Sequence, residues 1–133
     1  MPPINAILET VLYGENLAAI GSFYSEVLGL RRVSDSYPRG MAFRVGAESI
    51  LLLFDPRETR RDGGQVPTHG STGHGHLAMS VEPGQLDAWR THLTSRGIAI
   101  EREVTWPTGA RSLYFRDPAG NSVEFMAGDF WPR

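Results

Sequence analysis

Residues 76–97, HLAMSVEPGQLDAWRTHLTSRG, follow the same plan as residues 9–29, ETVLYGENLAAIGSFYSEVLG. Each stretch begins with an apolar, strand-like segment and continues into a helix whose apolar residues recur at helical spacing. Each ends in a glycine, which is well placed to terminate the helix at the C′ position. The first residues of the two stretches, Glu9 and His76, are 67 positions apart in a chain of 133 residues. This shared register predicts an internal duplication.

Three short strand-like segments are predicted after each helix, separated by glycine, proline and charged residues. In the first half we expect one helix between Asn16 and Gly29 and strands over 4–13, 30–36, 40–46 and 49–54. In the second half we expect one helix between Glu82 and Gly97 and strands over 75–81, 98–104, 110–115 and 122–126. Both halves therefore have the order βαβββ.

The segment between the halves changes in composition to Arg, Asp, Gly, Thr and Pro, which is typical of a surface connection. The predicted fold class is α+β, a single domain built from two tandem βαβββ modules. Their bounds are 4–56 and 75–127, with a connecting loop over 57–74 and a tail over 128–133. One module of about 55 residues exposes an apolar sheet face, so we expect two of them to pair and shelter a cleft that suits a ligand.

Composition excludes several classes of protein. The 13 basic and 15 acidic residues give a net charge of −2 and are interspersed along the chain, so no nucleic-acid partner is expected. No apolar run is long enough for a membrane span and the N-terminus does not resemble a signal peptide, so we expect a cytoplasmic protein with no membrane partner. The chain has no cysteine, so any metal must be held by His, Asp and Glu.

Three polar residues interrupt apolar strands and are the first candidates for a site: Glu9, His76 and Glu124. Burying an isolated carboxylate is costly, so such a Glu should face solvent, pair with a cation or bind a metal. The stretch HGSTGHGH, residues 69–76, holds three of the four histidines. Only His76 begins a strand, whereas His69 and His74 lie among small polar residues and are expected to face solvent or to gate a site.

The segments ETVLYGENLAAIGSFYSEVLGL, GHGHLAMSV and SLYFRDPAGNSVEF together resemble the vicinal oxygen chelate superfamily of glyoxalases, bleomycin-resistance proteins and extradiol dioxygenases. The resemblance covers nearly the whole chain. It implies an open, partly closed mixed β-barrel with the helices outside, one divalent metal ion, and a homodimer. It also implies that Glu9, His76 and Glu124 are the metal ligands.

The sequence departs from two patterns within that superfamily. Glyoxalase I takes a fourth ligand from the closing strand of the first module, but residues 50–54, ILLLF, are entirely apolar. Extradiol dioxygenases use two His and one carboxylate, but Glu9 replaces one of those His residues. A Glu, His, Glu triad leaves open coordination positions, as catalytic metals require. The ligand set suits manganese, iron(II), zinc, nickel or magnesium without selecting one.

The resemblance implies a metal-dependent enzyme, a lyase, isomerase or dioxygenase, that chelates a small oxygen-rich or aromatic substrate through vicinal oxygens. The alternative is a metal-free protein of the bleomycin-resistance type that sequesters an aromatic drug. We expect Glu124 and Tyr114 to take part in catalysis, and Ser112, Tyr114 and Trp106 to contact the substrate. Each of the last three could instead have an ordinary role in a strand or in the core.

Overall fold

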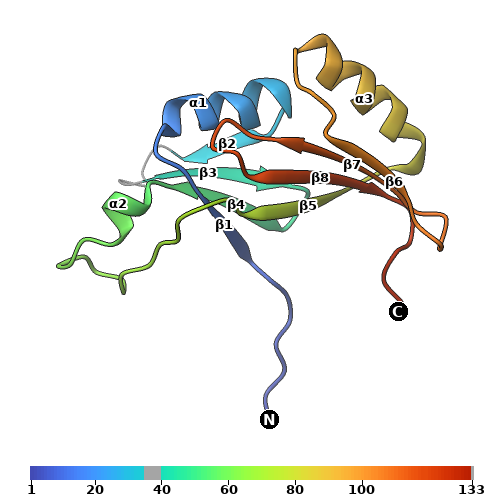
Figure 1. The fold of residues 1–133 in the computed structure, drawn as a ribbon. Helices are drawn as coiled ribbons and strands as arrows, with labels where there is room; N and C mark the ends of the chain where they lie inside the picture. Colours follow the sequence, from blue (N-terminus) through green and yellow to red (C-terminus); the bar gives the residue numbers. More distant parts are fainter. Residues whose placement is uncertain (35–39, 133) are drawn as a thin grey trace. The chain divides into compact units, whose positions relative to one another are not determined.

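The structure is a computed structural model that describes residues 1–34 and 40–132. The chain divides into two units, Met1–Gly73 and His74–Arg133. Each unit contains one four-stranded sheet with a helix lying across one of its faces (Figure 1). Among the described residues, no helix is both long enough and apolar enough to cross a membrane.

The first unit has the strand order β1-β4-β3-β2, in which β1 and β4 are parallel and the other pairs antiparallel. Its elements are β1 (Glu9–Tyr13), α1 (Leu17–Ser22), the π-helical turn η1 (Phe23–Val27), β2 (Arg31–Ser34), β3 (Gly40–Val45), β4 (Ser49–Phe54) and α2 (Pro56–Thr59). The helix begins where predicted, because the Asn16 side chain accepts a hydrogen bond from the Ala19 N–H at 3.2 Å. The predicted strand positions 35 and 36 lie outside the described residues.

One strand predicted for the first unit is wrong in its bounds, and one short helix was not predicted. The strand expected over 4–13 begins only at Glu9, because its partner β4 begins at Ser49 and the exposed side chains of Ile4 and Ile7 have no neighbouring strand in the described structure. The connection contains a short helix, α2, because the Asp55 side chain accepts from the Arg57 N–H at 2.9 Å and Pro56 stands at the first helical position.

The two faces of the first sheet differ in what covers them. On one face, Phe43, Leu51 and Leu53 are buried, and the Phe43 ring lies 6.2 Å from that of the buried Tyr24 of η1. On the opposite face, a second apolar cluster contains Ala42, Leu52 and Phe54 of β3 and β4. The β1 residues Val11 and Tyr13 pack against this second cluster. The alternation of side chains along the strands therefore separates a helix-covered face from the opposite face, which is also apolar. In each sheet, we call the face that carries no helix the inner face.

The second unit repeats this arrangement with the strand order β5-β8-β7-β6, in which β5 and β8 are parallel. Its elements are β5 (His76–Val81), the 3₁₀ turn η2 (Pro83–Gln85), α3 (Leu86–Ser95), β6 (Arg102–Thr105), β7 (Arg111–Arg116) and β8 (Ser122–Ala127). Gly97, with φ of 75°, ends α3 in a Schellman motif, since the Ile98 N–H bonds the Leu93 carbonyl at 2.9 Å. The strand expected over 98–104 begins only at Arg102, after the residues that follow this helix end.

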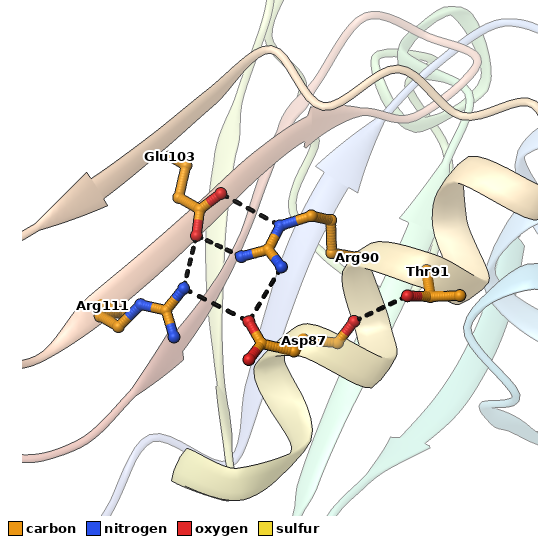
Figure 2. Close-up of polar contacts among 5 residues, drawn as sticks. All are labelled: Asp87, Arg90, Thr91, Glu103 and Arg111. Carbon is orange, nitrogen blue, oxygen red and sulfur yellow. Dashed lines mark hydrogen bonds and ion pairs between the residues drawn. The ribbon is translucent and has the colours of Figure 1, made fainter.

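A network of ion pairs attaches α3 to its sheet (Figure 2). Arg90 of α3 bonds Asp87 on the same helix at 2.9 Å and also bonds Glu103 of β6. Arg111 of β7 bonds Glu103 at 2.6 Å and Asp87 at 3.4 Å. The guanidinium groups of Arg90 and Arg111 lower the pKa of Asp87 and the pKa of Glu103, which favours the charged form of both carboxyl groups.

The α+β class and the two βαβββ modules are confirmed. The partly closed barrel was expected from the two modules together, and each module by itself forms an open sheet: among the described residues, each four-stranded sheet has two edge strands that pair with one neighbour only. The shared topology places β1 and β5, and likewise β4 and β8, at equivalent positions in the two units.

Candidate metal centre

The inner face of the second sheet brings together two of the predicted metal ligands. His76 opens β5 and pairs with Ser122 of β8, so that His76 and Glu124 stand on the same side of adjacent parallel strands. The His76 Nε2 atom lies 3.3 Å from Glu124 Oε2. The other ring nitrogen, Nδ1, lies 3.1 Å from the Ser122 carbonyl oxygen. A carbonyl only accepts, so Nδ1 donates to it, and Nε2 is the ring nitrogen that faces Glu124.

Glu124 has an unusual environment for a carboxylate. It is only 3% exposed, and its Oε1 atom is buried without a hydrogen-bond partner in the described structure. A buried carboxylate oxygen without a partner costs free energy unless a cation or a donor compensates it. A carboxylate oxygen and an imidazole nitrogen are both good donors to a divalent metal. The arrangement of these two side chains therefore fits a metal ion.

Glu9, the third predicted ligand, is the first residue of β1 in the other unit and pairs with Ile50 of β4. It occupies in the first sheet the register position that His76 occupies in the second. Within the described residues of either unit, no three His, Asp or Glu side chains gather closely enough to hold a metal ion. The second unit thus supplies a pair of candidate ligands, and the first unit supplies one.

Tyr114 lies directly beside this pair. It stands opposite Glu124 in the register of β7 and β8, and its ring stacks with that of His76 at 6.3 Å between centroids and 23° between planes. Burial raises the pKa of Tyr114, and the hydrogen bond and negative charge of Glu124 raise it further, against a smaller lowering by Ser112. The phenol therefore keeps its proton at neutral pH and acts as a donor.

Ser112 and Trp106, both predicted to contact the substrate, bond each other. The Trp106 indole Nε1 donates to the Ser112 Oγ at 2.8 Å, and Ser112 is fully buried. The Trp106 ring also contacts Phe130 of the tail, edge to face, with centroids 4.9 Å apart. Since Ser112 also hydrogen-bonds Tyr114, its hydroxyl connects the indole to the phenol that stands beside Glu124.

One pair of residues that position His76 was not identified from the sequence. Asn121 and Asp117 were assigned only to a turn, but both are buried. The Asn121 Oδ1 accepts from the Gly75 N–H at 2.7 Å, and the Asn121 amide nitrogen donates to Asp117 at 2.9 Å. This contact ties the residue before His76 to the residue before β8. The signal available in the sequence was the pair of Asx residues at the two ends of the turn.

The remaining histidines of the 69–76 stretch have separate contacts. His69, expected to face solvent or to gate, accepts or donates a 2.6 Å hydrogen bond with the Tyr13 hydroxyl of β1. Its ring meets Phe54 edge to face, 5.3 Å between centroids. His74 lies against the turn before β8, where a Cβ added at Gly120 would come within 2.6 Å of its ring.

Two characterised relatives align with the chain. One is the metallothiol transferase FosB of Shouchella clausii, 34% identical over 90 residues, which are 65% of this chain and 56% of the relative. The other is biphenyl-2,3-diol 1,2-dioxygenase 3 of Rhodococcus globerulus, 33% identical over 125 residues, which are 90% of this chain and 62% of the relative. The chain therefore spans about six tenths of the length of these two proteins.

Solved structures match over the full length. A lactoylglutathione lyase from Agrobacterium tumefaciens is 38% identical, with a TM-score of 0.92 over 99% of this chain and 100% of that one. A glyoxalase/bleomycin resistance protein/dioxygenase from Nocardioides is 26% identical, with a TM-score of 0.73 over 98% of this chain and 93% of that one. The family model of these proteins matches residues 6–125. The chain belongs to the Glyoxalase/Bleomycin resistance protein/Dioxygenase superfamily.

Proposed function

We propose that this chain is a divalent-metal-dependent enzyme that binds a small oxygen-rich or aromatic substrate through two adjacent oxygens. The observation that carries the proposal is the inner face of the second sheet. There, the buried Oε1 of Glu124 has no hydrogen-bond partner among the described residues, and the Ser122 carbonyl holds His76 with its Nε2 3.3 Å from the other carboxylate oxygen. Glu9 would complete the ligand set as the third residue.

A divalent metal at these residues would act as a Lewis acid that polarises the substrate oxygens. The chain's own groups have defined parts in that chemistry. The Ser122 carbonyl orients the imidazole of His76, and Asn121 fixes the strand that carries it. The phenol of Tyr114, protonated at neutral pH, can donate to a substrate oxygen or hold a proton beside Glu124.

We rank the candidate reaction types by how completely each relative aligns with this chain. The alignment with the lactoylglutathione lyase covers essentially the full length of both chains, so we place lyase or isomerase chemistry first. Dioxygenase chemistry comes second, because the dioxygenase relative aligns over 90% of this chain but only 62% of its own length. The metals to be tested are those that suit the ligand set: manganese, iron(II), zinc and nickel.

Elemental analysis of protein purified without chelator, followed by calorimetric titration of the stripped protein with Mn²⁺ and Zn²⁺, tests the proposal. We expect about one metal ion per chain. Glu124→Gln should lower the metal affinity by more than the roughly 10- to 100-fold lost when a residue that only hydrogen-bonds a metal ligand is replaced. Glu82→Gln, at an exposed position before α3, serves as the matched control and should bind like the wild type. A wild-type protein that binds no divalent metal would contradict the proposal and favour the metal-free drug-binding alternative.

A further inference from the structure

A line of hydrogen bonds crosses the inner face of the second sheet and ends at Glu124. The Trp106 indole Nε1 lies 2.8 Å from the Ser112 Oγ. Ser112 hydrogen-bonds Tyr114, which is two residues further along β7 and therefore on the same side of the sheet. Tyr114 hydrogen-bonds Glu124, with which it pairs in the register of β7 and β8. We call these four connected side chains the hydrogen-bond chain.

The number of protons on each side chain fixes the direction of these bonds. An indole N–H only donates, and a carboxylate only accepts. The hydroxyl of Tyr114 has a single proton, and the bond to Glu124 uses it. The bond between Ser112 and Tyr114 must therefore take its proton from Ser112, whose oxygen accepts from Trp106. All the bonds run one way, from the indole to the carboxylate.

The influence of each neighbour on the pKa of Tyr114 agrees with this direction. Burial raises that pKa most, and the hydrogen bond to Glu124 raises it further, because loss of the phenol proton would break that bond. The hydrogen bond with Ser112 lowers the pKa of Tyr114, because a donor to the phenol oxygen favours the phenolate. Tyr114 therefore donates on one side and accepts on the other.

The turn between β6 and β7 fixes the first donor of the hydrogen-bond chain. The Trp106 N–H donates to the Ala110 carbonyl at 2.8 Å, and the Gly109 N–H donates to the Trp106 carbonyl at 2.9 Å. Gly109 has φ of 87°, a conformation that glycine adopts without steric cost. The Phe130 ring packs edge to face on the indole, 4.9 Å between centroids. The turn and the tail together hold the indole N–H against Ser112.

The first sheet shows that the fold does not need this hydrogen-bond chain. The residues of β3 at the register positions of Ser112 and Tyr114 are Gly40 and Ala42. Neither has a side chain that donates or accepts a hydrogen bond. The strand order of the two sheets is nevertheless the same. The hydrogen-bond chain is therefore an addition to the second unit, and it ends on the buried carboxylate of Glu124.

We propose that Trp106 and Ser112 are positioning residues for Glu124, because they direct the hydroxyl proton of Tyr114 to its carboxylate. Tyr114 then steadies Glu124 instead of donating to a substrate. The Oε1 atom of Glu124, which has no hydrogen-bond partner among the described residues, stays available for a cation. The direction of the bonds does not depend on a metal, whereas their effect on metal affinity rests on the proposed function.

Proton NMR of the full chain in EDTA tests the direction of the bonds. The hydroxyl proton of Tyr114 is the resonance that Tyr114→Phe removes. We expect Ser112→Ala to speed the exchange of this proton with water by roughly two- to tenfold, the range of one neutral hydrogen bond. Trp106→Phe, which keeps an aromatic ring against Phe130, should act in the same direction by less.

Ser80→Ala, the same substitution at an exposed position of β5, is the control and should leave the exchange rate of the Tyr114 proton unchanged. An exchange rate in Ser112→Ala equal to that of the wild type would overturn the inference. A Tyr114 proton that exchanges too fast to be detected in the wild type would overturn it as well.

A double-mutant cycle on metal affinity tests whether Ser112 acts through Tyr114. In calorimetric titrations with Mn²⁺, Tyr114→Phe should lower the affinity by roughly 10- to 100-fold, as for other partners of metal ligands. Ser112→Ala should lower it by roughly two- to tenfold in the wild type, but by less than about twofold in Tyr114→Phe. An equal loss in both backgrounds would overturn the inference. A wild type that binds no Mn²⁺ contradicts the proposed function alone, and the exchange rates then decide the inference.

Discussion

The two sheets share strand order and register, yet their inner faces carry opposite chemistry. In the first sheet Leu52 pairs with Ala42, and in the second sheet the equivalent residues are Glu124 and Tyr114. One pair forms part of an apolar cluster, and the other places a buried carboxylate beside a phenol. One backbone plan therefore supports both an apolar face and a polar site, because the side chains of one face can change without disturbing the hydrogen bonds between the strands.

The helix-covered faces, in contrast, are alike. Leu51 and Leu53 of β4 and the equivalent Val123 and Phe125 of β8 are all buried. In the second unit the Phe125 ring packs against Trp89 of α3, 4.6 Å between centroids. Close packing leaves little freedom on these faces, so the chemical difference between the units is confined to the inner faces.

The largest expected effect on stability comes from replacing Leu52 of the first sheet with the residue type at the equivalent position of the second sheet, glutamate. Leu52 is 2% exposed and lies in the apolar cluster, so Leu52→Glu would bury a carboxylate with no partner. We expect a loss of about 3–5 kcal/mol in the free energy of unfolding, measured in urea at neutral pH. Leu52→Met, of similar volume, should cost less than about 1.5 kcal/mol. Equal stability of the two variants would show that the two inner faces are not chemically distinct.

The reciprocal change, Glu124→Leu, gives the second sheet the residue of the first. Metal affinity should fall by more than about 100-fold, because a direct ligand is lost rather than an outer partner. The free energy of unfolding should change little, since removing the unpaired Oε1 offsets the loss of the contact between Oε2 and His76. Calorimetric metal titration and urea unfolding measure the two effects. A strong loss of stability with intact metal binding would assign Glu124 to the core instead.

A smaller effect is expected in the turn that positions His76. Gly120 has φ of 83°, and a Cβ there would come within 2.6 Å of the His74 ring. Gly120→Ala should therefore cost about 1–3 kcal/mol of stability, as expected for a residue forced into a left-handed conformation. Gly84→Ala is the control, since a Cβ at Gly84 meets no atom within 4 Å. If thermal denaturation gives the two variants the same Tm, this turn is not a rigid support of β5.

The smallest effect is expected at the ion pairs that hold α3 to the second sheet. Arg90 and Arg111 lower the pKa of Glu103, so the pairs stabilise the fold above the ordinary carboxyl pKa and this contribution is lost as pH falls through the lowered value. Glu103 is 35% exposed, so solvent screens the pairs, and Glu103→Gln should lower Tm by only about 1–3 °C at pH 7. The difference from wild type should shrink in acid. A difference that grows below pH 4 would contradict this sign.

Local pattern was enough to predict the modules and the alignment of side chains on each sheet. Alternation in β8 placed Glu124 away from the helix, and the glycines at 29 and 97 end their helices with positive φ as expected. Strand bounds were less accurate, because the start of β1 at Glu9 depends on the partner β4 and not on the apolar residues before it. The predicted homodimer stays a prediction that sedimentation equilibrium can test.

The parts of the site that sequence reasoning missed depend on contacts between distant residues. His69 and Tyr13 are 56 positions apart, and no spacing rule links a histidine in a polar loop to a tyrosine on the first strand. The unpartnered oxygens of Thr59 and Glu124 are likewise properties of the folded chain. The helix that carries Thr59 could have been predicted from the sequence, because Asp55 followed by Pro56 is a capping signal.

The central claim, that His76 and Glu124 make the inner face of the second sheet a metal site, is tested most directly by identifying the nitrogen ligand. Electron spin-echo envelope modulation of the protein loaded with Cu²⁺ reports the imidazole nitrogens near the bound ion. We predict modulation from a single histidine that persists in His69→Gln and His74→Gln and disappears in His76→Gln. Modulation that survives in His76→Gln would place the metal elsewhere and contradict the account.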